Sequence, residues 1–137
     1  MLSGIDPLLT GSLLAHLDAM GHSDSVVIAD AHFPAARLCE RVVTFPTLSS
    51  PDVLRAIRTV IPLDDHSAAA LDLMESADGK VLQVQSELVD AADALGRERY
   101  LERFAFYEAA ATAFVIVRTG ETRSYGNALL RKGLVQR

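Results

Sequence analysis

The sequence has no tryptophan, few other aromatic residues, and a single cysteine, Cys39. One cysteine excludes an internal disulfide and fits a reducing compartment, so we expect a cytoplasmic protein. The residues 1–7 lack the basic start and the apolar run of a signal peptide. No segment reaches the roughly 20 apolar residues that a membrane helix needs, so we expect no membrane partner.

Basic clusters and the common nucleotide motifs are also missing. The formal net charge is −5, and an acidic chain without a basic patch is poorly suited to a phosphate backbone, so we expect no nucleic-acid partner. The glycines are isolated, which excludes the glycine-rich phosphate loops. No Gly-x-Ser-x-Gly nucleophile elbow is present either.

What the chain does have is apolar material in short, regularly spaced runs. Half of its 137 residues are hydrophobic, which predicts one domain over residues 1–137 with a sizeable core. The run 25–29 shows no polar alternation, as is typical of a strand covered on both faces. Strands and helices that alternate favour an α/β sandwich with a mostly parallel sheet. Further strands are expected at residues 41–45, 70–74 and 114–118, and helices from Asp6–Pro7, Thr10 or Ser12 to Gly21, from Ser50 to Pro62, from Ser86 to Gly96, and within 99–113.

The first candidate functional residues flank the run 25–29. His22 follows the expected helix stop at Gly21, where a histidine can act as a general acid/base or simply favour the helix C-terminus. Asp30 either binds hydroxyl groups and steers a proton or is a turn residue after the strand. His32 is either a second acid/base or a histidine packed in a loop.

The length of the run 25–29 limits how these residues can cooperate. A strand of about five to seven residues spans roughly 20 Å, so His22 and Asp30 sit at its opposite ends. A shared site requires the turn at His22 to fold back, or His22 to reach a neighbouring subunit. The spacing of His22, Asp30 and His32 matches no known zinc-ligand pattern and Cys39 is distant, so we expect no metal.

Two further clusters carry polar groups. Within Arg103–Glu108, an arginine beside aromatic rings is able to bind a polar ligand, although the helical spacing is equally that of core packing with Arg103 at the rim. Tyr125–Asn127 offers a phenol and an amide around a glycine, either as donors and acceptors for hydroxyl groups or as a simple turn.

Taken together, these stretches resemble a known family. Met20–His22, Asp30–Pro34, Arg103–Glu108 and Tyr125–Asn127, in this order, are similar to the L-fucose mutarotase branch of the RbsD/FucU family of sugar mutarotases and pyranases. The ending Lys132–Gly133 is similar too. The strings Asp-Ala-His-Phe-Pro and Arg-Phe-Ala-Phe-Tyr-Glu resemble the fucose type more than the D-ribose pyranase type.

The resemblance implies an isomerase that interconverts the α and β anomers of a free monosaccharide, first of all L-fucose. It also implies a Rossmann-like three-layer fold, no cofactor, and a ring-shaped homo-oligomer, often a decamer, with sites at subunit contacts. By match of motifs, His22 is the acid/base, Asp30 and Arg103 bind the sugar, and Tyr125 and Asn127 complete the pocket.

The middle of the chain departs from the fucose type. There the resemblance matches Asp65 to the acid of an Asp-Ser-Tyr-Ala-Pro-like stretch and puts Ser67 in place of its tyrosine. Two other hypotheses remain beside the mutarotase. One is a non-catalytic monosaccharide-binding or regulatory protein on the same fold. The other is a purely structural assembly subunit, which does not explain why Arg103, Tyr125 and Asn127 occur together.

Overall fold

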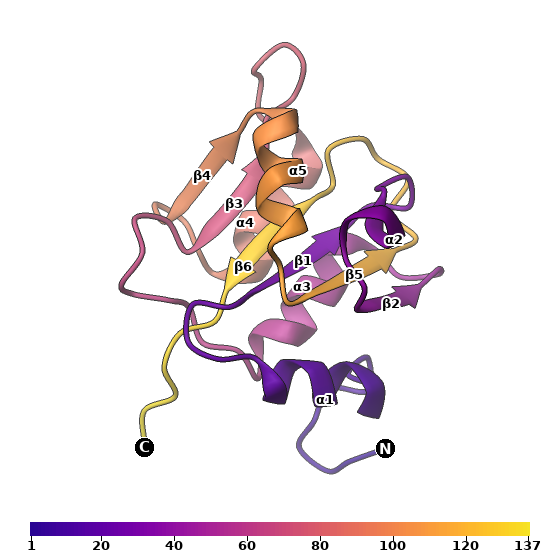
Figure 1. Ribbon diagram of the computed structural model, residues 1–137, viewed down its shortest axis with the longest axis vertical. Helices are drawn as coiled ribbons and strands as arrows, with labels where there is room; N and C mark the ends of the chain where they lie inside the picture. The colour runs from indigo at the N-terminus through magenta and orange to yellow at the C-terminus, as the bar shows by residue number, and fades with distance from the viewer.

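A six-stranded sheet forms the centre of the computed structural model, which describes residues 1–137 (Figure 1). The strand order is β2-β5-β1-β6-β3-β4, and β6 runs antiparallel to both of its neighbours while the other pairs are parallel. This confirms the mostly parallel sheet. The strands are β1 (Ser25–Ala29), β2 (Val42–Phe45), β3 (Leu71–Met74), β4 (Glu98–Leu101), β5 (Val115–Thr119) and β6 (Ala128–Arg131).

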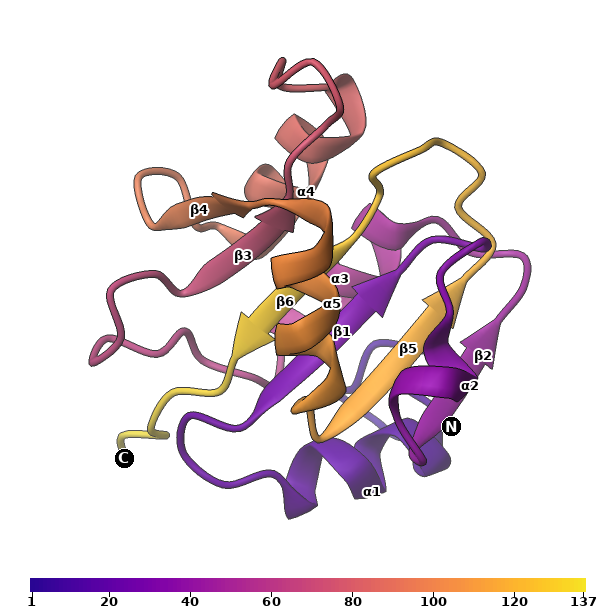
Figure 2. The same ribbon diagram turned by 45° about the horizontal axis from the view of Figure 1, so that its top comes forward.

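Helices cover both faces of this sheet, as the apolar run of β1 predicts. Val26 and Ile28 pack into the cluster that includes α1, α3 and α4, whereas Val27 and Ala29 pack on the opposite side with α2 and α5. Figure 2 shows α5 crossing one face with α3 behind the sheet. The three-layer sandwich is therefore confirmed. The helices are α1 (Gly11–Ala19), α2 (Ala35–Leu38), α3 (Ser50–Arg58), α4 (Gln83–Ala92) and α5 (Arg103–Ala111).

The helix starts differ in part from the sequence expectations. Of the alternatives for α1, Thr10 is the cap, and its hydroxyl accepts a hydrogen bond from the Leu13 N–H. The predicted start of α4 at Ser86 is wrong, because the helix begins at Gln83. The side chain of Gln85 accepts a hydrogen bond from the Leu82 N–H and donates one to the Met74 carbonyl, which fixes the earlier start against β3.

The helix expected within 99–113 is present as α5, but the residues before it form strand β4. Pairing with β3 overrides helical propensity over Glu98–Leu101, and Arg99 forms two hydrogen bonds with the buried Asp72 at 2.9 and 3.0 Å. The Glu102 carboxylate then accepts hydrogen bonds from the first backbone N–H groups of α5. None of the helices combines the length and the hydropathy needed to cross a membrane.

Candidate functional site

The predicted site residues fall at opposite edges of the sheet. Asp30, Arg103, Tyr125 and Asn127 line one pocket at the carboxyl ends of the parallel strands. His22 precedes β1 at the other edge, in the loop that leads into this strand in Figure 1. The turn at His22 does not fold back along β1. A site that His22 and Asp30 share within one chain is therefore ruled out, and the second alternative, contact with a neighbouring subunit, stays a prediction.

The pocket at the carboxyl edge is small and mostly polar. Its volume is about 250 Å³, below the roughly 300 to 1,000 Å³ that is common for larger organic ligands. The groups that face it come from the loops after β1 and β5, from the end of β3 and from α5. The lining residues are Asp30, His32, Phe33, Met74, Arg103, Tyr107, Ser124, Tyr125 and Asn127.

Asp30 and Asn127 form a reciprocal pair at the base of the pocket. The Asn127 amide nitrogen donates to the Asp30 carboxylate at 3.0 Å, and its Oδ1 accepts from the Asp30 backbone N–H at 2.7 Å. Both side chains are buried. Burial raises the pKa of Asp30, and hydrogen bonds from His32 N–H and Asn127 oppose that rise. Because the Asn127 amide is occupied in this way, its direct effect is to hold Asp30 in place.

Arg103 and the aromatic rings form the wall of the pocket. The Arg103 Nε donates to the Tyr107 hydroxyl at 3.2 Å, and the Tyr107 ring packs edge-on against Phe33. The remaining guanidinium donors of Arg103 have no hydrogen-bond partner in the chain, which leaves them for a ligand. Tyr125 holds a left-handed backbone with φ of 63°, an uncommon conformation for a bulky residue that often marks a functional position.

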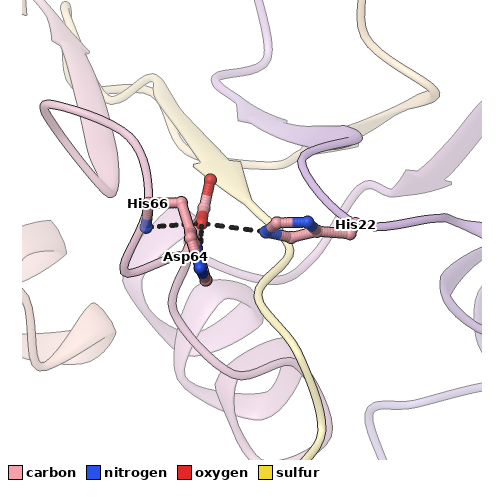
Figure 3. A group of neighbouring side chains, drawn as sticks. All are labelled: His22, Asp64 and His66. Carbon is pink, nitrogen blue, oxygen red and sulfur yellow. Dashed lines mark hydrogen bonds and ion pairs between the residues drawn. The ribbon is translucent and has the colours of Figure 1, made fainter.

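At the opposite edge, His22 faces Asp64. The His22 Nε2 lies 3.2 Å from Oδ1 of Asp64, whose side chain is only 1% exposed (Figure 3). The N–H of His66 and the hydroxyls of Ser67 and Ser23 also donate to this carboxylate. These bonds, that of His66 N–H most of all, hold the pKa of Asp64 well below its usual value against the opposing effect of burial.

The ionised Asp64 fixes the tautomer of a neutral His22. A carboxylate accepts hydrogen bonds only, so the Nε2 of His22 carries the proton that it donates to Asp64. The other ring nitrogen, Nδ1, is then an acceptor. With 35% of its side chain exposed, His22 is able to receive a proton from a bound molecule through Nδ1 while Asp64 stabilises the imidazolium.

The turn that carries His22 is held from both sides. The Gly21 N–H donates to the Asp24 carboxylate at 2.8 Å, and the Ser23 N–H donates to the Lys132 carbonyl at 2.9 Å. The left-handed residue of this turn is Ser23, with φ of 68°. The helix ends at Ala19 with Met20 as its cap, just before the expected stop at Gly21, and the left-handed reversal lies two residues after that glycine.

The last residues of the chain bring Asp64 beside this turn. The Gly133 N–H donates to the Pro62 carbonyl at 2.9 Å, and a side chain at Gly133 would collide with the Leu63 carbonyl oxygen. The Nζ of Lys132 donates to two carbonyl oxygens at the end of α1, at 2.7 Å each. The two backbone segments therefore pack directly on each other, and this contact fixes Asp64 relative to His22.

The buried acid that faces His22 is Asp64, whereas the sequence prediction chose its neighbour, Asp65. Asp65, not Asp64, was matched to the acid of the middle stretch, yet the Asp65 side chain is 78% exposed and pairs with Arg97. Tyr107 and Ser124 were also not singled out as pocket residues. The aromatic cluster around Arg103 signalled Tyr107, but neither periodicity nor spacing distinguishes the buried Asp64 from Asp65.

A polar pocket at the carboxyl edge of the sheet places the chain among α/β proteins that bind small ligands where the parallel strands end. Within this class it belongs to the RbsD / FucU transport protein family, whose model matches residues 3–135. This family membership confirms the resemblance seen in the short motifs.

Individual relatives agree over almost the full length. The chain is 42% identical to the fucose mutarotase of Danio rerio, over 98% of this chain and 95% of that protein. It is 39% identical to the L-fucose mutarotase of Histophilus somni, over 98% and 97%. Among solved structures, the fucose mutarotase of Streptococcus pneumoniae in complex with L-fucose superposes with a TM-score of 0.92 at 31% identity, covering 98% of this chain and all of that one.

Proposed function

We propose that the protein is a sugar mutarotase, an isomerase that interconverts the α and β anomers of a free monosaccharide, with L-fucose as the first candidate. The observation that carries the proposal is the pair of His22 and the buried Asp64. It supplies a proton acceptor at Nδ1 and a negative charge behind the ring. The relatives are named fucose mutarotase and L-fucose mutarotase, and these names support both the reaction class and the sugar.

Anomer exchange needs proton transfers and little else. A base removes the proton of the anomeric hydroxyl, an acid protonates the ring oxygen, and the bond between the anomeric carbon and that oxygen breaks. The open-chain aldehyde rotates and the ring closes on its other face. His22 serves as one of these groups, and a positioned acid or base typically contributes about a hundredfold or more.

The pocket supplies groups suited to sugar hydroxyls. Asp30 accepts hydrogen bonds, Arg103 has free donors, and the Tyr125 phenol does either. Asn127 contributes mainly through Asp30, which it holds with two hydrogen bonds. A second cavity, which shares His32, Arg103 and Tyr107 with this pocket, leaves room for a further wall from another molecule.

We further propose that each working site is shared between subunits of a homo-oligomer in the cytoplasm, in the form of a decameric ring. The reason is geometric, because β1 separates His22 from the pocket in one chain. In a ring, the His22 loop of one subunit reaches the pocket of the next. Sedimentation of the purified chain tests the assembly, and a monomer at working concentration would rule out the shared site.

The decisive experiment is NMR saturation transfer between the anomers of L-fucose, D-ribose and related sugars. We expect exchange well above the spontaneous rate with at least one sugar, fastest with L-fucose. If exchange were no faster than in buffer with every sugar, the proposed mutarotase activity would be wrong. If such a sugar still bound, the non-catalytic monosaccharide-binding protein would be the correct account.

A further inference from the structure

The side chains around Asp64 include a group that the proposed reaction does not use. The Nδ1 of His66 lies 3.6 Å from the same Asp64 oxygen that faces His22 at 3.2 Å. The two imidazole rings meet edge to face with centroids 5.0 Å apart. A hydrogen-bonded acid/base pair needs only one of these histidines. Figure 3 shows that both rings turn a nitrogen toward the carboxylate, from two separate loops.

The spacing of these three atoms fits a metal ion. Tetrahedral zinc with bonds of about 2.0 to 2.1 Å places its ligand atoms about 3.4 Å from one another. The two distances to the Asp64 oxygen are already close to that value, and all three ligand atoms lie within 4.8 Å of each other. The His66 side chain is 67% exposed, so its ring is free to close the remaining gap.

The surroundings of Asp64 orient it for this role. The hydroxyls of Ser23 and Ser67 both donate to Oδ2, at 3.2 and 3.0 Å, and so hold the carboxylate from behind. Oδ1 is left facing the two rings, with the His66 backbone N–H as its only other donor. Such outer hydrogen bonds are a regular feature of metal sites, because they fix the orientation of the ligating oxygen.

We propose that His22, Asp64 and His66 bind a divalent transition-metal ion of the zinc class, one per chain. Imidazole and carboxylate suit zinc, cobalt(II) and nickel(II) rather than calcium or magnesium. Three protein ligands leave a fourth position for water, and the exposed rings give the ion access from solvent. This ligand set differs from His22, Asp30 and His32, whose spacing in the sequence matches no zinc site. In the structure, β1 lies between His22 and the other two residues.

The ion blocks the proposed reaction rather than assisting it. Once Nε2 of His22 is bound to metal, the proton of the neutral ring sits on Nδ1, which then donates and no longer accepts. The acid/base function of His22 is lost while the ion is bound. This consequence rests on the proposed function, whereas the metal site itself does not. Free zinc is therefore a reversible inhibitor that competes for the acid/base residue.

The binding test uses the untagged chain titrated with cobalt(II) and with zinc. We expect the visible absorption bands of a tetrahedral cobalt centre, saturation at one ion per chain, and displacement of cobalt by zinc. His66→Asn, at an exposed position, should weaken binding at least tenfold. His16→Asn, which changes a half-buried histidine of α1 outside the cluster, should bind as the unmodified chain does.

Two results of this titration would overturn the metal site: no saturable binding, or equal affinity in His66→Asn and the unmodified chain. The inhibitory consequence has its own measurement, anomer exchange at saturating zinc and after addition of a chelator. We expect exchange to fall at least tenfold and to recover. Exchange unchanged by bound zinc would overturn the inhibition. A chain that binds zinc but never exchanges anomers would contradict the proposed function alone.

Discussion

The Nε2 of His22 lies 3.2 Å from Oδ1 of Asp64, a buried carboxylate that is 42 residues further along the chain. The contact joins the loop before β1 to the loop before β3, at the edge of the sheet opposite the polar pocket. It sets the tautomer of a neutral His22, because an ionised carboxylate accepts and never donates. The proposed acid/base pair therefore comes from two loops, and the polar pocket from other segments.

Replacing His22 by alanine tests the proposed acid/base directly. We expect His22→Ala to slow anomer exchange by a factor of about ten or more, since a positioned acid/base typically contributes at least that much. The side chain is partly exposed, so the fold should survive. Saturation-transfer NMR measures the exchange, and His16→Ala is the control because it removes a half-buried histidine of α1 that does not contact Asp64. Unchanged exchange in His22→Ala would assign the acid/base to another residue.

Asp64→Asn tests whether Asp64 acts through His22. Asparagine keeps the shape, and the hydroxyls of Ser23 and Ser67 are able to accept from its NH2 group, so its oxygen still faces the ring. The negative charge that stabilises the imidazolium is lost. We expect kcat to fall by about tenfold while KM for the sugar stays nearly constant, as for a group that acts in the transition state.

Asp65→Asn is the control for this substitution, because Asp65 is exposed and does not contact His22. Steady-state measurement of anomer exchange over a range of sugar concentrations separates kcat from KM. A change confined to KM would mean that Asp64 shapes the binding surface and does not support the acid/base.

Mixing two impaired variants tests whether the site is shared. His22→Ala and Arg103→Ala each remove one half of the proposed site, from opposite edges of the sheet. If subunits are exchanged at random, about a quarter of the shared sites combine an intact His22 with an intact Arg103. We therefore expect the mixture, after dissociation and reassembly, to recover about a quarter of the original exchange rate. Activity no higher than that of the separate variants would mean that His22 and the Arg103 pocket do not act together in a site shared between subunits.

The sequence predicts strands β1, β2, β3 and β5, which are mostly apolar runs. It misses β4, whose residues are mostly polar, and β6, whose place depends on distant partners. Strand β1 was recognisable because apolar side chains fill both of its faces. Strand β4 was not, because Glu98–Leu101 reads as helical, and its extended form depends on pairing with β3 and on the ion pair of Arg99 with Asp72. Strand β6 lies antiparallel between β1 and β3, and no local pattern indicates that position.

The site shows the same limit. Motif order led to His22, Asp30, Arg103, Tyr125 and Asn127, and the length of β1 already indicated that the first two lie apart. The choice between Asp64 and Asp65 depends on which of two adjacent side chains points inward. That is decided by contacts with the loop before β1, which are distant in sequence.

The pair of Glu121 and Arg123 predicts a dependence of stability on pH. Glu121 is 5% exposed and accepts two hydrogen bonds from Arg123 at 2.9 Å, which lower its pKa from the ordinary value of 4.5. A carboxyl group with a lowered pKa in the folded state stabilises the fold above the unfolded value, and this contribution disappears as the pH falls through the folded value. The pair should therefore stabilise the protein at neutral pH and not in acid.

Glu121→Gln should lower the free energy of unfolding by about 1 kcal/mol at neutral pH, a modest figure because Arg123 is partly exposed and screened by solvent. The difference from the unmodified chain should shrink as the pH falls below 4.5. Urea unfolding over this range measures both values, with Glu40→Gln as the exposed control. A difference that is constant with pH would mean that the carboxylate charge plays no part.

Gly133→Ala tests whether the chain end positions Asp64. A methyl group at Gly133 would collide with the Leu63 carbonyl oxygen and lie 3.0 Å from the Asp64 nitrogen, and neither backbone atom is able to move without its segment. Overpacking of this kind typically costs about 1 to 3 kcal/mol. Because the displaced segment carries Asp64, we expect anomer exchange to fall as well, by a factor of about ten, which is the loss expected for a misplaced acid/base pair.

Gly11→Ala is the control for this change, because a methyl group there meets nothing within 4 Å and the residue lies in α1. Alanine should leave exchange unchanged and raise stability by up to about 1 kcal/mol, in line with its higher helix propensity. Urea unfolding and saturation transfer, run on both variants, separate the two effects. If Gly133→Ala lost stability but kept full exchange, the chain end would support the fold without fixing Asp64 against His22.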